Sequence, residues 1–553
     1  MSFVNPTQGR IPKESVIITL VPQDYHYFCR MPQKVDLRVP PEIADNDQQL
    51  KKMLAQKLNI SEKRINAFQI QRRSIDARSR NIVVQMQVNV FVEETFEDAF
   101  AFTPQLQNVH NAKPVIVAGA GPAGLFAALQ LIEKGLCPII IERGKDVRER
   151  RRDLAAMNKE GIVNPESNYC YGEGGAGTYS DGKLYTRSNK RGSIFRSLQW
   201  FHYFGATEKI LYEAHPHIGT NKLPHIITAM REAIEACGGK VLFNTKVTDF
   251  IIEGDTLKGV VVNDTENIKA DALILATGHS ARDIFELLDR KQILIESKPF
   301  ALGVRIEHQQ ALIDATQYHC SVDAPRSDYL PAAAYSLVSQ ELGRGVFSFC
   351  MCPGGIIAPA STQEGELVVN GWSPSKRDGN FANSGMVVTV DEKDFATYGF
   401  TGALAGMHFQ QMVERKAWQA GGGKLVAPAQ RMTDFVGNKR SGSLLDCSYL
   451  PGTNSALMSE ILPKEVYASM AKAFVSFGKK MKGYYTENAM VLATESRTSS
   501  PVRIPRNEDS LQHPQIKGLF PCAEGAGYAG GIISAAMDGD KVAMKVWEYY
   551  EVL

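Results

Sequence analysis

Short apolar runs separated by helix-like segments follow residue 112, and this pattern predicts a parallel sheet. Residues 115–118, Val-Ile-Val-Ala, are continuously apolar, as are strands buried on both faces of a sheet. Residues 125–134 are interpreted as a helix that ends at Gly135, because glycine is common just beyond a helix C-terminus. A second apolar strand is expected at 138–141. In this order the elements predict a βαβ unit.

Later segments extend the same sheet. We expect a helix at 223–237 followed by a strand at 241–244, and another buried strand at 272–276. The short alternating segments of 245–262 are typical of an antiparallel meander. Residues 518–550 predict a second strand, glycine loop and helix, some 400 residues after the first.

The character of the chain changes on either side of this region. After residue 298, long alternating segments predict a mostly β region, followed by a helix at 464–481 with one apolar face. Before it, a small α+β unit is expected from a strand, a helix, a hairpin joined at 78–81, and a linker. The alternating segments are 300–307, 345–350, 366–372 and 386–390, and the N-terminal elements are 15–21, 46–58, 65–77, 82–93 and 102–112.

A glycine motif stands at the first strand–helix junction. Gly119, Gly121 and Gly124 fit G-x-G-x-x-G, in which the glycines allow a tight turn, phosphate approach and close helix packing. Glu142 ends the second strand, at a spacing that suits a carboxylate accepting from ribose hydroxyls. The motif alone is weak evidence, since glycine loops match it by chance. With strand, helix, second strand and acid in place, it predicts dinucleotide binding.

Composition restricts the class of protein further. The 553 residues carry a net charge of +2, with 44% hydrophobic and 22% charged residues, close to globular averages. No apolar run reaches the roughly 18 residues of a membrane-spanning helix, and the N-terminus lacks the apolar segment of a secretory signal. Nine scattered cysteines form no disulfide framework. We expect a reduced, cytoplasmic protein.

Four features together resemble the glutathione-reductase-like flavoprotein superfamily, in its branch with a single nucleotide-binding domain. They are the glycine motif with Glu142, the strand that ends at 276–278, the meander before it, and the segment GLFPCAEGAGYAGGI at 518–532. In that superfamily the last segment lies along the flavin's ribityl and pyrophosphate groups. Here Glu524-Gly525 stands where many members have Gly-Asp, so the acid is displaced by one position.

Three further segments are similar to one subgroup, the bacterial uncharacterised FAD-dependent dehydrogenase family. They are GEGGAGTYSDGKL at 172–184, CMCPGG at 350–355 and ESRTSSPVR at 495–503. The resemblance covers nearly the whole chain. It implies a fold and FAD as the cofactor, but it supplies no substrate.

The implied fold class is α/β: a Rossmann-like FAD-binding domain in two segments, an inserted mostly β substrate domain, and an N-terminal α+β domain. The expected bounds are 1–105 for the N-terminal domain, 106–298 and 490–553 for the FAD-binding domain, and 299–489 for the inserted domain. No second G-x-G-x-x-G lies in a βαβ context, so a separate NAD(P) domain is not expected, and NAD(P)H is a candidate only as a transient co-substrate.

The expected cofactor-binding residues come from all of these segments. They are Gly119, Gly121, Pro122, Ala123, Gly124, Glu142, Arg143, Gly174, Gly175, Ala176, Gly177, Thr178, Ser180, Lys183, Val247, Ala276, Thr277, Gly278, Glu524, Gly525, Gly531 and Ile532.

The catalytic residues stay open. Asp181, Lys183, Arg497 and Arg503 are candidates for charge near the flavin or substrate, with surface salt bridges as the alternative. His279 is a candidate proton donor or a loop cap.

The other notable cysteines and histidines give no evidence of a redox or metal-binding role. Cys350 and Cys352 are interpreted as structural rather than as a redox disulfide, because their neighbours Phe and Met suggest a buried strand. His215 and His217 form no metal set with a nearby cysteine pair, so no metal is expected.

These features favour an FAD-dependent oxidoreductase acting on a small molecule, in an oligomeric state that the sequence does not reveal. Residues 51–80 carry nine Lys and Arg against two acids, which keeps a flavin-dependent tRNA-modifying protein as an alternative. A solvated face is the preferred interpretation, because residues 1–105 hold 14 basic and 12 acidic residues in all. A non-catalytic FAD-binding sensor is the second alternative.

Overall fold

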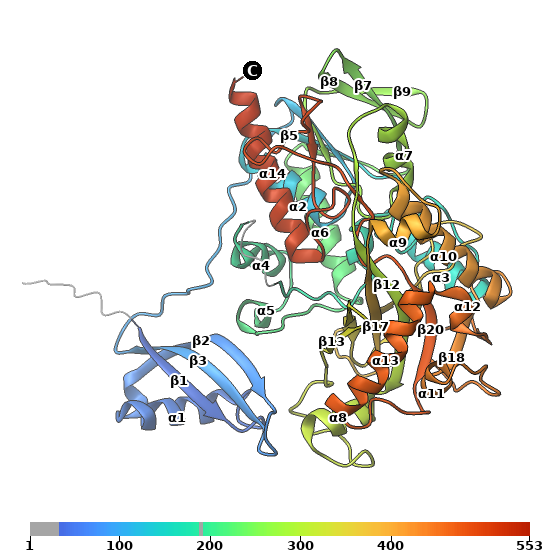
Figure 1. The fold of residues 1–553 in the computed structure, drawn as a ribbon. Coiled ribbons are helices and arrows are strands. Elements are labelled where there is room, and N and C mark those ends of the chain that lie inside the picture. The colour runs from blue at the N-terminus through green and yellow to red at the C-terminus, as the bar shows by residue number, and fades with distance from the viewer. Residues whose placement is uncertain (1–31, 187–191, 553) are drawn as a thin grey trace, which may run out of the picture.

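The computed structural model describes residues 32–186 and 192–552, and the strands in these ranges form six sheets (Figure 1). A small N-terminal unit lies at one side, joined by an extended linker to the rest of the chain. A parallel sheet and a larger mixed sheet make up the main body. The strand expected at 15–21 lies outside the described residues. No helix in the described ranges is long and apolar enough to cross a membrane.

The N-terminal unit, residues 32–93, is a three-stranded antiparallel sheet with one helix. Strands β1 (Gln33–Val39), β2 (Ile65–Asp76) and β3 (Val83–Val92) pair in the order β1-β3-β2, and α1 (Asp47–Leu58) packs on them. The helix begins where the Asn46 side chain accepts from the Gln49 N–H, which satisfies a donor that the first turn leaves without a partner.

The parallel sheet has the order β22-β10-β4-β5-β6. Helices cover one face of this sheet, and the antiparallel strands at 247–262 and the helix at 282–290 cover the other. Burial on both faces explains the continuous hydrophobicity of the strands. The βαβ unit is confirmed as β4, α2 and β5. The elements are β4 (Pro114–Ala118), α2 (Pro122–Glu133), β5 (Cys137–Ile141), α6 (Leu223–Ala236), β6 (Lys240–Leu242), β10 (Leu273–Leu275), β22 (Leu519–Pro521) and α14 (Ile532–Val552).

The C-terminal segment, about 400 residues after the βαβ unit, packs against this unit and adds a strand to its sheet. Helix α14 runs beside α2 (Figure 1), and Gly539 permits the contact, since a Cβ there would lie 2.1 Å from the Ala123 carbonyl oxygen. The strand β22 pairs with β10, as expected if the end of the chain returns to the nucleotide unit.

The expected meander is present as β7 (Val247–Glu253), β8 (Thr256–Val262) and β9 (Glu266–Lys269), paired antiparallel. After Glu142 comes α3 (Val147–Glu160), which is capped by the Asp146 side chain. Helices α4 (Ile194–Tyr203), α5 (Lys209–Tyr212) and α7 (Arg282–Arg290) complete this part.

The larger sheet has seven strands in the order β13-β14-β17-β12-β20-β18-β19. They are β12 (Phe300–Gln309), β13 (Val338–Glu341), β14 (Arg344–Cys352), β17 (Phe381–Val390), β18 (Ala427–Arg431), β19 (Thr453–Ser455) and β20 (Met490–Glu495). The helices of this part are α8 (Gln310–Tyr318), α9 (Glu392–Thr397), α10 (Ala405–Gly421), α11 (Met432–Val436), α12 (Met458–Ile461) and α13 (Lys464–Lys480).

Two details differ from the sequence expectations. The segment expected as a long strand at 366–372 contributes only β16 (Val369–Trp372), which pairs with β15 (Ile356–Pro359) in a separate ribbon. The proposed domain boundary at 489/490 precedes β20, yet β20 pairs with β12 and β18 in the seven-stranded sheet. We therefore propose that the inserted domain extends through β20, because a strand belongs with the sheet that satisfies its backbone.

Short elements connect these parts. β11 (Glu296–Ser297) and β21 (Val502–Arg503) form a two-residue antiparallel pair where the chain leaves and re-enters the parallel-sheet domain. Two 3₁₀ turns, η1 (Glu62–Arg64) and η2 (Gly175–Gly177), precede the hairpin and shape the glycine-rich loop.

Candidate functional site

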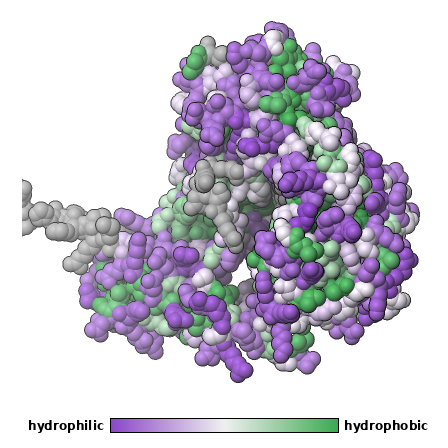
Figure 2. Space-filling model, viewed as in Figure 1, coloured by the Kyte–Doolittle hydropathy of each residue, from purple (hydrophilic) through white to green (hydrophobic). Residues whose placement is uncertain are grey.

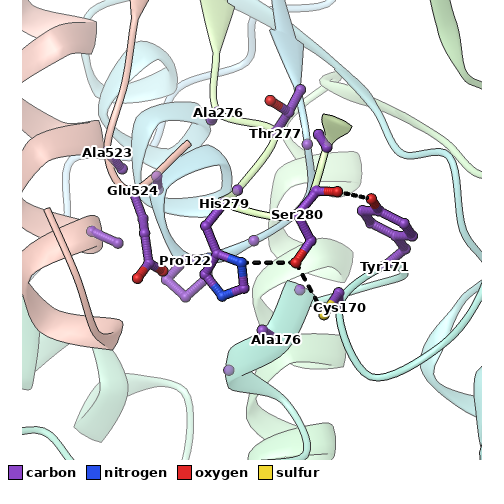
Figure 3. Close-up of a pocket in the computed structure, with 18 of the residues that line it drawn as sticks. Pro122, Cys170, Tyr171, Ala176, Ala276, Thr277, His279, Ser280, Ala523 and Glu524 are labelled. Atoms are coloured by element: carbon purple, nitrogen blue, oxygen red, sulfur yellow. Dashed lines mark hydrogen bonds between the residues drawn. The ribbon is translucent and has the colours of Figure 1, made fainter. Parts of the chain in front are cut away.

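A long cavity opens at the carboxyl ends of the parallel strands, the edge at which ligands bind in open α/β sheets. It encloses about 1510 Å³ of empty space, part of it open to solvent. Figure 3 shows side chains from several distant segments directed into it. The sequence-predicted residues that line it are Gly119, Gly121, Pro122, Ala123, Glu142, Arg143, Gly175, Ala176, Gly177, Ser180, Lys183, Val247, Ala276, Thr277, Gly278, Glu524, Gly531 and Ile532.

The glycine motif shapes one end of the cavity. Gly119 has φ +110°, and a Cβ there would lie 2.4 Å from the Ala276 carbonyl oxygen, so only glycine fits. Gly121 is different: its φ is −76° and the nearest atom to a Cβ would be Gly175 Cα at 3.9 Å. The Gly121 backbone therefore faces open space at the N-terminus of α2, where the first N–H groups and the helix dipole favour an anion.

Glu142 organises the backbone around the motif. Its carboxylate accepts hydrogen bonds at 2.9 Å from three N–H groups, those of Ala120, Gly144 and Gly172. One oxygen, Oε2, accepts only the Ala120 bond among these, so it has a lone pair available to a ligand hydroxyl. Glu142 thus joins the glycine motif to the glycine-rich loop and keeps an acceptor at the cavity wall.

Arg150 holds the glycine-rich loop from behind. Its guanidinium is completely buried and donates at 2.8–3.0 Å to four carbonyl oxygens. Burial lowers the pKa of this arginine. The sequence showed only a highly charged helix here, and no pattern distinguished Arg150 from its neighbouring arginines. The four acceptors are carbonyls of Asn168, Tyr169, Glu173 and Gly175.

The loop after β10 supplies the opposite wall. Thr277 Oγ1 is shielded from solvent and has no hydrogen-bond partner among the described residues. At Gly278, φ is +77° and a Cβ would meet nothing within 4 Å. Tyr171 donates through its hydroxyl to the Ser280 carbonyl and so fixes this loop to the glycine-rich loop (Figure 3).

His279 extends into the cavity beside this loop (Figure 3). Burial lowers its pKa to about 4, with help from the positive charges of Arg497 and Arg282. The imidazole is therefore neutral at pH 7, and its Nδ1 lies 2.8 Å from Ser280 Oγ. A neutral imidazole can accept or donate one proton, but it adds no positive charge to the site.

The segment after β22 closes the cavity. Glu524 extends into it (Figure 3), and burial raises the pKa of this carboxyl to about 8, with Lys298 opposing the shift. Glu524 is therefore largely protonated at pH 7. Gly531 precedes α14 with φ +82° and nothing within 4 Å of a Cβ position, so a second helix N-terminus faces the cavity with an open backbone.

Charged residues gather where the cavity meets the seven-stranded sheet. Lys183 Nζ lies 3.0 Å from Asp181 Oδ2, and Arg377 binds the same carboxylate at 2.5 Å. Burial opposes ionisation of Asp181, but these two cations lower its pKa to about 2. Cys350, at the end of β14, lines the same part of the cavity.

Arg497 also lines the cavity, but its charge is already balanced. It shares a buried network with Arg282, Glu366 and Glu414, in which Arg497 Nη2 and Arg282 Nη2 each lie 2.9 Å from Glu414 Oε2. Burial alone would raise the pKa of Glu414, but the two arginines lower it overall. The network joins α7 to α10 and makes Arg497 a positioning group rather than a spare cation.

Some predicted residues lie outside the cavity lining. Gly124, Gly174, Thr178 and Gly525 pack behind the wall; a Cβ on Gly124, for example, would lie 1.9 Å from the Gly119 carbonyl oxygen. Arg503 is also outside and lies over the Tyr528 ring at 5.0 Å. Sequence reasoning missed Cys170, Tyr171, Thr245, Lys246, Asp283, Phe349, Asn370 and Thr498, which line the cavity from segments without a nucleotide-binding motif.

The basic residues of the N-terminal unit are partly neutralised by neighbouring acids. Arg64 pairs with Glu93, and Arg78 pairs with Asp76. Among the residues that the structure describes, no group of three or more His, Cys, Asp or Glu is arranged to hold a metal ion. His215 and His217 instead line a wider cleft between the three parts.

Comparison with known proteins places the chain in a family. Residues 299–498 match the family model described as "FAD-dependent protein, C-terminal domain-like", residues 220–342 match "FAD dependent oxidoreductase", and residues 31–91 match a domain of unknown function. A Clostridium beijerinckii protein described as "Uncharacterized protein" is 42% identical over 523 residues, which cover 91% of this chain and 96% of the relative. The chain belongs to the FAD-dependent oxidoreductase family.

Other likenesses of the chain are weaker. Thiamine thiazole synthase of Aeropyrum pernix is 27% identical over 199 residues, or 33% of this chain and 61% of that protein. Glycine oxidase of Bacillus cereus aligns over 79% of this chain and 95% of its own, at 13% identity and a TM-score of 0.29. Halogenase PltM aligns over 80% and 70%, at 12% identity and a TM-score of 0.34. None of these bears on the reaction.

The cavity fits the cofactor of the family. Open backbone at Gly121, Gly278 and Gly531 provides space that a Cβ would fill, and Thr277 Oγ1 is a buried polar atom in need of a partner. Two helix N-termini face the same space, which suits a diphosphate. A bound FAD would supply two-electron redox chemistry, leaving the protein to position, polarise and exclude water.

Proposed function

We propose that this chain binds one FAD along the cavity and uses it to oxidise or reduce a small organic molecule. The observation that supports this most is the shared wall of the cavity. Residues of the parallel-sheet domain form one end, whereas Phe349, Cys350 and Asn370 of the inserted domain form the other. A cofactor bound to the parallel-sheet domain would therefore place one of its ends against the inserted domain.

The proposed roles follow from position. The α2 N-terminus at Gly121 would hold the pyrophosphate, and Glu142 Oε2 would accept from a ribose hydroxyl. Val247, at the start of the meander, lines the same end and would contact the adenine. Gly531 at the start of α14 would lie against the flavin end of the cofactor.

The far end of the cavity would determine the substrate. Lys183 contributes a cation, Glu524 a protonated carboxyl and His279 a neutral imidazole. These groups could hold a polar substrate and exchange protons with it, while the flavin exchanges electrons. We propose NAD(P)H as a transient electron donor. It would bind without a domain of its own, since the sequence carries no second dinucleotide motif in a βαβ context.

Anaerobic mixing tests this function. The purified holoprotein is mixed with NADH or NADPH in a stopped-flow instrument, and the flavin absorbance near 450 nm is followed. Loss of the band with saturable kinetics for one of the two donors supports an oxidoreductase. A bound flavin that neither donor reduces at a useful rate would reject NAD(P)H as donor and favour a substrate that reduces the flavin directly, or a flavin-bound sensor.

A further inference from the structure

Two cysteines lie together at the end of β14, where the inserted domain meets the cavity. Cys350 lines the cavity, whereas Cys352 is completely buried. The pairing of β14 with β17 changes register between Phe349 and Cys352, and Cys350 has a positive φ of 47°. This bulge interrupts the regular strand at the two cysteines, and bulges are frequent beside active sites because they redirect side chains.

The surroundings of the pair favour a thiolate. Lys183 Nζ lies 4.0 Å from Cys352 Sγ, and Arg305 Nη2 lies 3.5 Å from the same sulfur. Arg305 Nη2 also donates to the Cys350 carbonyl at 2.8 Å. Both cations lie beside the Cys352 sulfur, and cations next to a pair of adjacent thiols favour a thiolate and make it nucleophilic.

The two thiols also interact with each other. The Cys352 thiol donates to the Cys350 carbonyl at 3.3 Å, and its interaction with the Cys350 thiol lowers the pKa of Cys350 well below the usual value of a thiol, whereas the pKa of Cys352 rises. The acids that face Cys350 oppose the lowering of its pKa only in part. Asp181 is paired with Lys183, and burial raises the pKa of Glu495 to about 7 and that of Glu524 to about 8.

We propose that Cys350 and Cys352 form a redox dithiol that exchanges two electrons with the bound flavin. The inference rests on the proposed function, since it needs FAD in the cavity. It replaces the structural role that the Cys-Met-Cys sequence favoured. Exposure to the cavity identifies Cys350 as the thiol that faces the cofactor, with Cys352 as its buried partner.

The step balances within the protein and its cofactor. The Cys350 thiolate and the Cys352 thiol form one S–S bond, and the S–H bond of Cys352 breaks. The electron pair passes to oxidised FAD, and the proton from Cys352 is taken up by the reduced flavin. In the reverse direction a reduced flavin returns two electrons and the proton, and the disulfide opens to thiolate and thiol.

An anaerobic reductive titration of the holoprotein with dithionite tests the pair. Air-oxidised wild-type protein is expected to consume about four electrons per flavin, two for the flavin and two for the disulfide. The Cys350→Ser and Cys352→Ser variants are expected to consume about two, and the control Cys320→Ser, at an exposed position, about four. Consumption of two electrons by the wild-type protein would overturn the proposal.

A second readout does not depend on redox activity or on any cysteine variant. Oxidised holoprotein is denatured, alkylated without reductant and digested. The mass of the peptide that contains Cys350 and Cys352 is then measured by mass spectrometry. We expect this peptide to lack two hydrogens and to carry no alkyl group, and recovery of both cysteines alkylated would contradict the proposal. Flavin content, measured on the same sample, distinguishes failure of the proposed function from failure of the dithiol proposal. Protein that lacks FAD would contradict the proposed function. Protein that contains FAD but no disulfide would contradict only the Cys350–Cys352 dithiol.

The thiolate itself can be measured before any electron transfer. At pH 6.5, iodoacetamide should modify Cys350 of freshly reduced protein faster than Cys320, and Lys183→Met should slow the reaction at Cys350 about tenfold. Equal rates at Cys350 with and without Lys183 would show that the cation does not activate this thiol.

Discussion

At the residue scale, the glycines of the G-x-G-x-x-G motif fall into two physical classes. Gly119 and Gly124 pack directly against backbone atoms, so their substitution disturbs the fold itself. Gly121 faces open space and has an ordinary φ, so a side chain there is tolerated by the chain and obstructs only a ligand. This difference allows cofactor binding to be tested apart from folding.

Gly121→Ala should therefore leave the apoprotein's melting temperature unchanged and weaken FAD binding about tenfold or more, because the added methyl occupies the space at the α2 N-terminus. Isothermal titration of the apoprotein with FAD measures the effect. Gly442→Ala is the matched control, since Gly442 is exposed with nothing within 4 Å of a Cβ position. Unchanged affinity in Gly121→Ala would place the diphosphate elsewhere.

Glu524 makes FAD affinity depend on pH. Its pKa is raised to about 8, so the carboxyl is neutral below that pH and charged above it. A bound cofactor would exclude water from this buried carboxyl and disfavour its charged form, so FAD affinity should fall as the pH rises from 7 to 9. Titrations at several pH values measure this, and Glu524→Gln should remove the dependence. A pH profile identical in both proteins would contradict the assignment.

At the element scale, the sequence predicted which helices and strands form, but it did not predict the tertiary contacts between elements that are distant in the chain. The apolar run 115–118 and the motif Gly119 to Gly124 predicted β4 and α2 because local pattern determines both. The close contact of Gly539 with α2 and the hydrogen bonds from Arg150 to four carbonyls are tertiary contacts. Such contacts leave no local pattern in the sequence. The cysteine pair was recognised in sequence, but its position beside Lys183 and Arg305 was not predictable.

Gly539→Ala tests the contact between α14 and α2. The added methyl would meet the Ala123 carbonyl oxygen at 2.1 Å, so the helices must separate, at a cost of about 1–3 kcal/mol in the free energy of unfolding. Denaturant unfolding followed by circular dichroism measures the loss. Glu548→Ala, at an exposed position of the same helix, should change stability little. Equal stabilities for the two variants would show that α14 does not pack on α2 through Gly539.

At the scale of the whole molecule, three parts meet around a cleft that is distinct from the cavity proposed to bind FAD. The face in Figure 2 is mostly hydrophilic, and a hollow separates the N-terminal unit from the seven-stranded sheet. Arg73 spans the junction: its guanidinium binds Asp45 at 2.7 Å and lies 3.5 Å from Glu213, in the main body. No residue of the N-terminal unit lines the cofactor cavity.

Arg73→Met should therefore loosen the N-terminal unit without changing FAD binding. Because Arg73 is buried and holds two carboxylates, its loss should raise the rate of proteolysis in the linker at 94–112 about tenfold. Arg64→Met, which removes an exposed ion pair with Glu93, serves as control. Reduced FAD content in Arg73→Met would instead link the N-terminal unit to the cofactor site.

The flavin content of the purified chain shows whether the cavity between the two large sheets binds FAD. The protein is denatured, and the released cofactor is identified and quantified by chromatography against standards, before and after incubation of the apoprotein with FAD. We expect about one FAD per chain, bound without a covalent bond, and a strongly reduced content in Gly121→Ala. A folded, colourless protein that takes up no FAD would contradict this expectation.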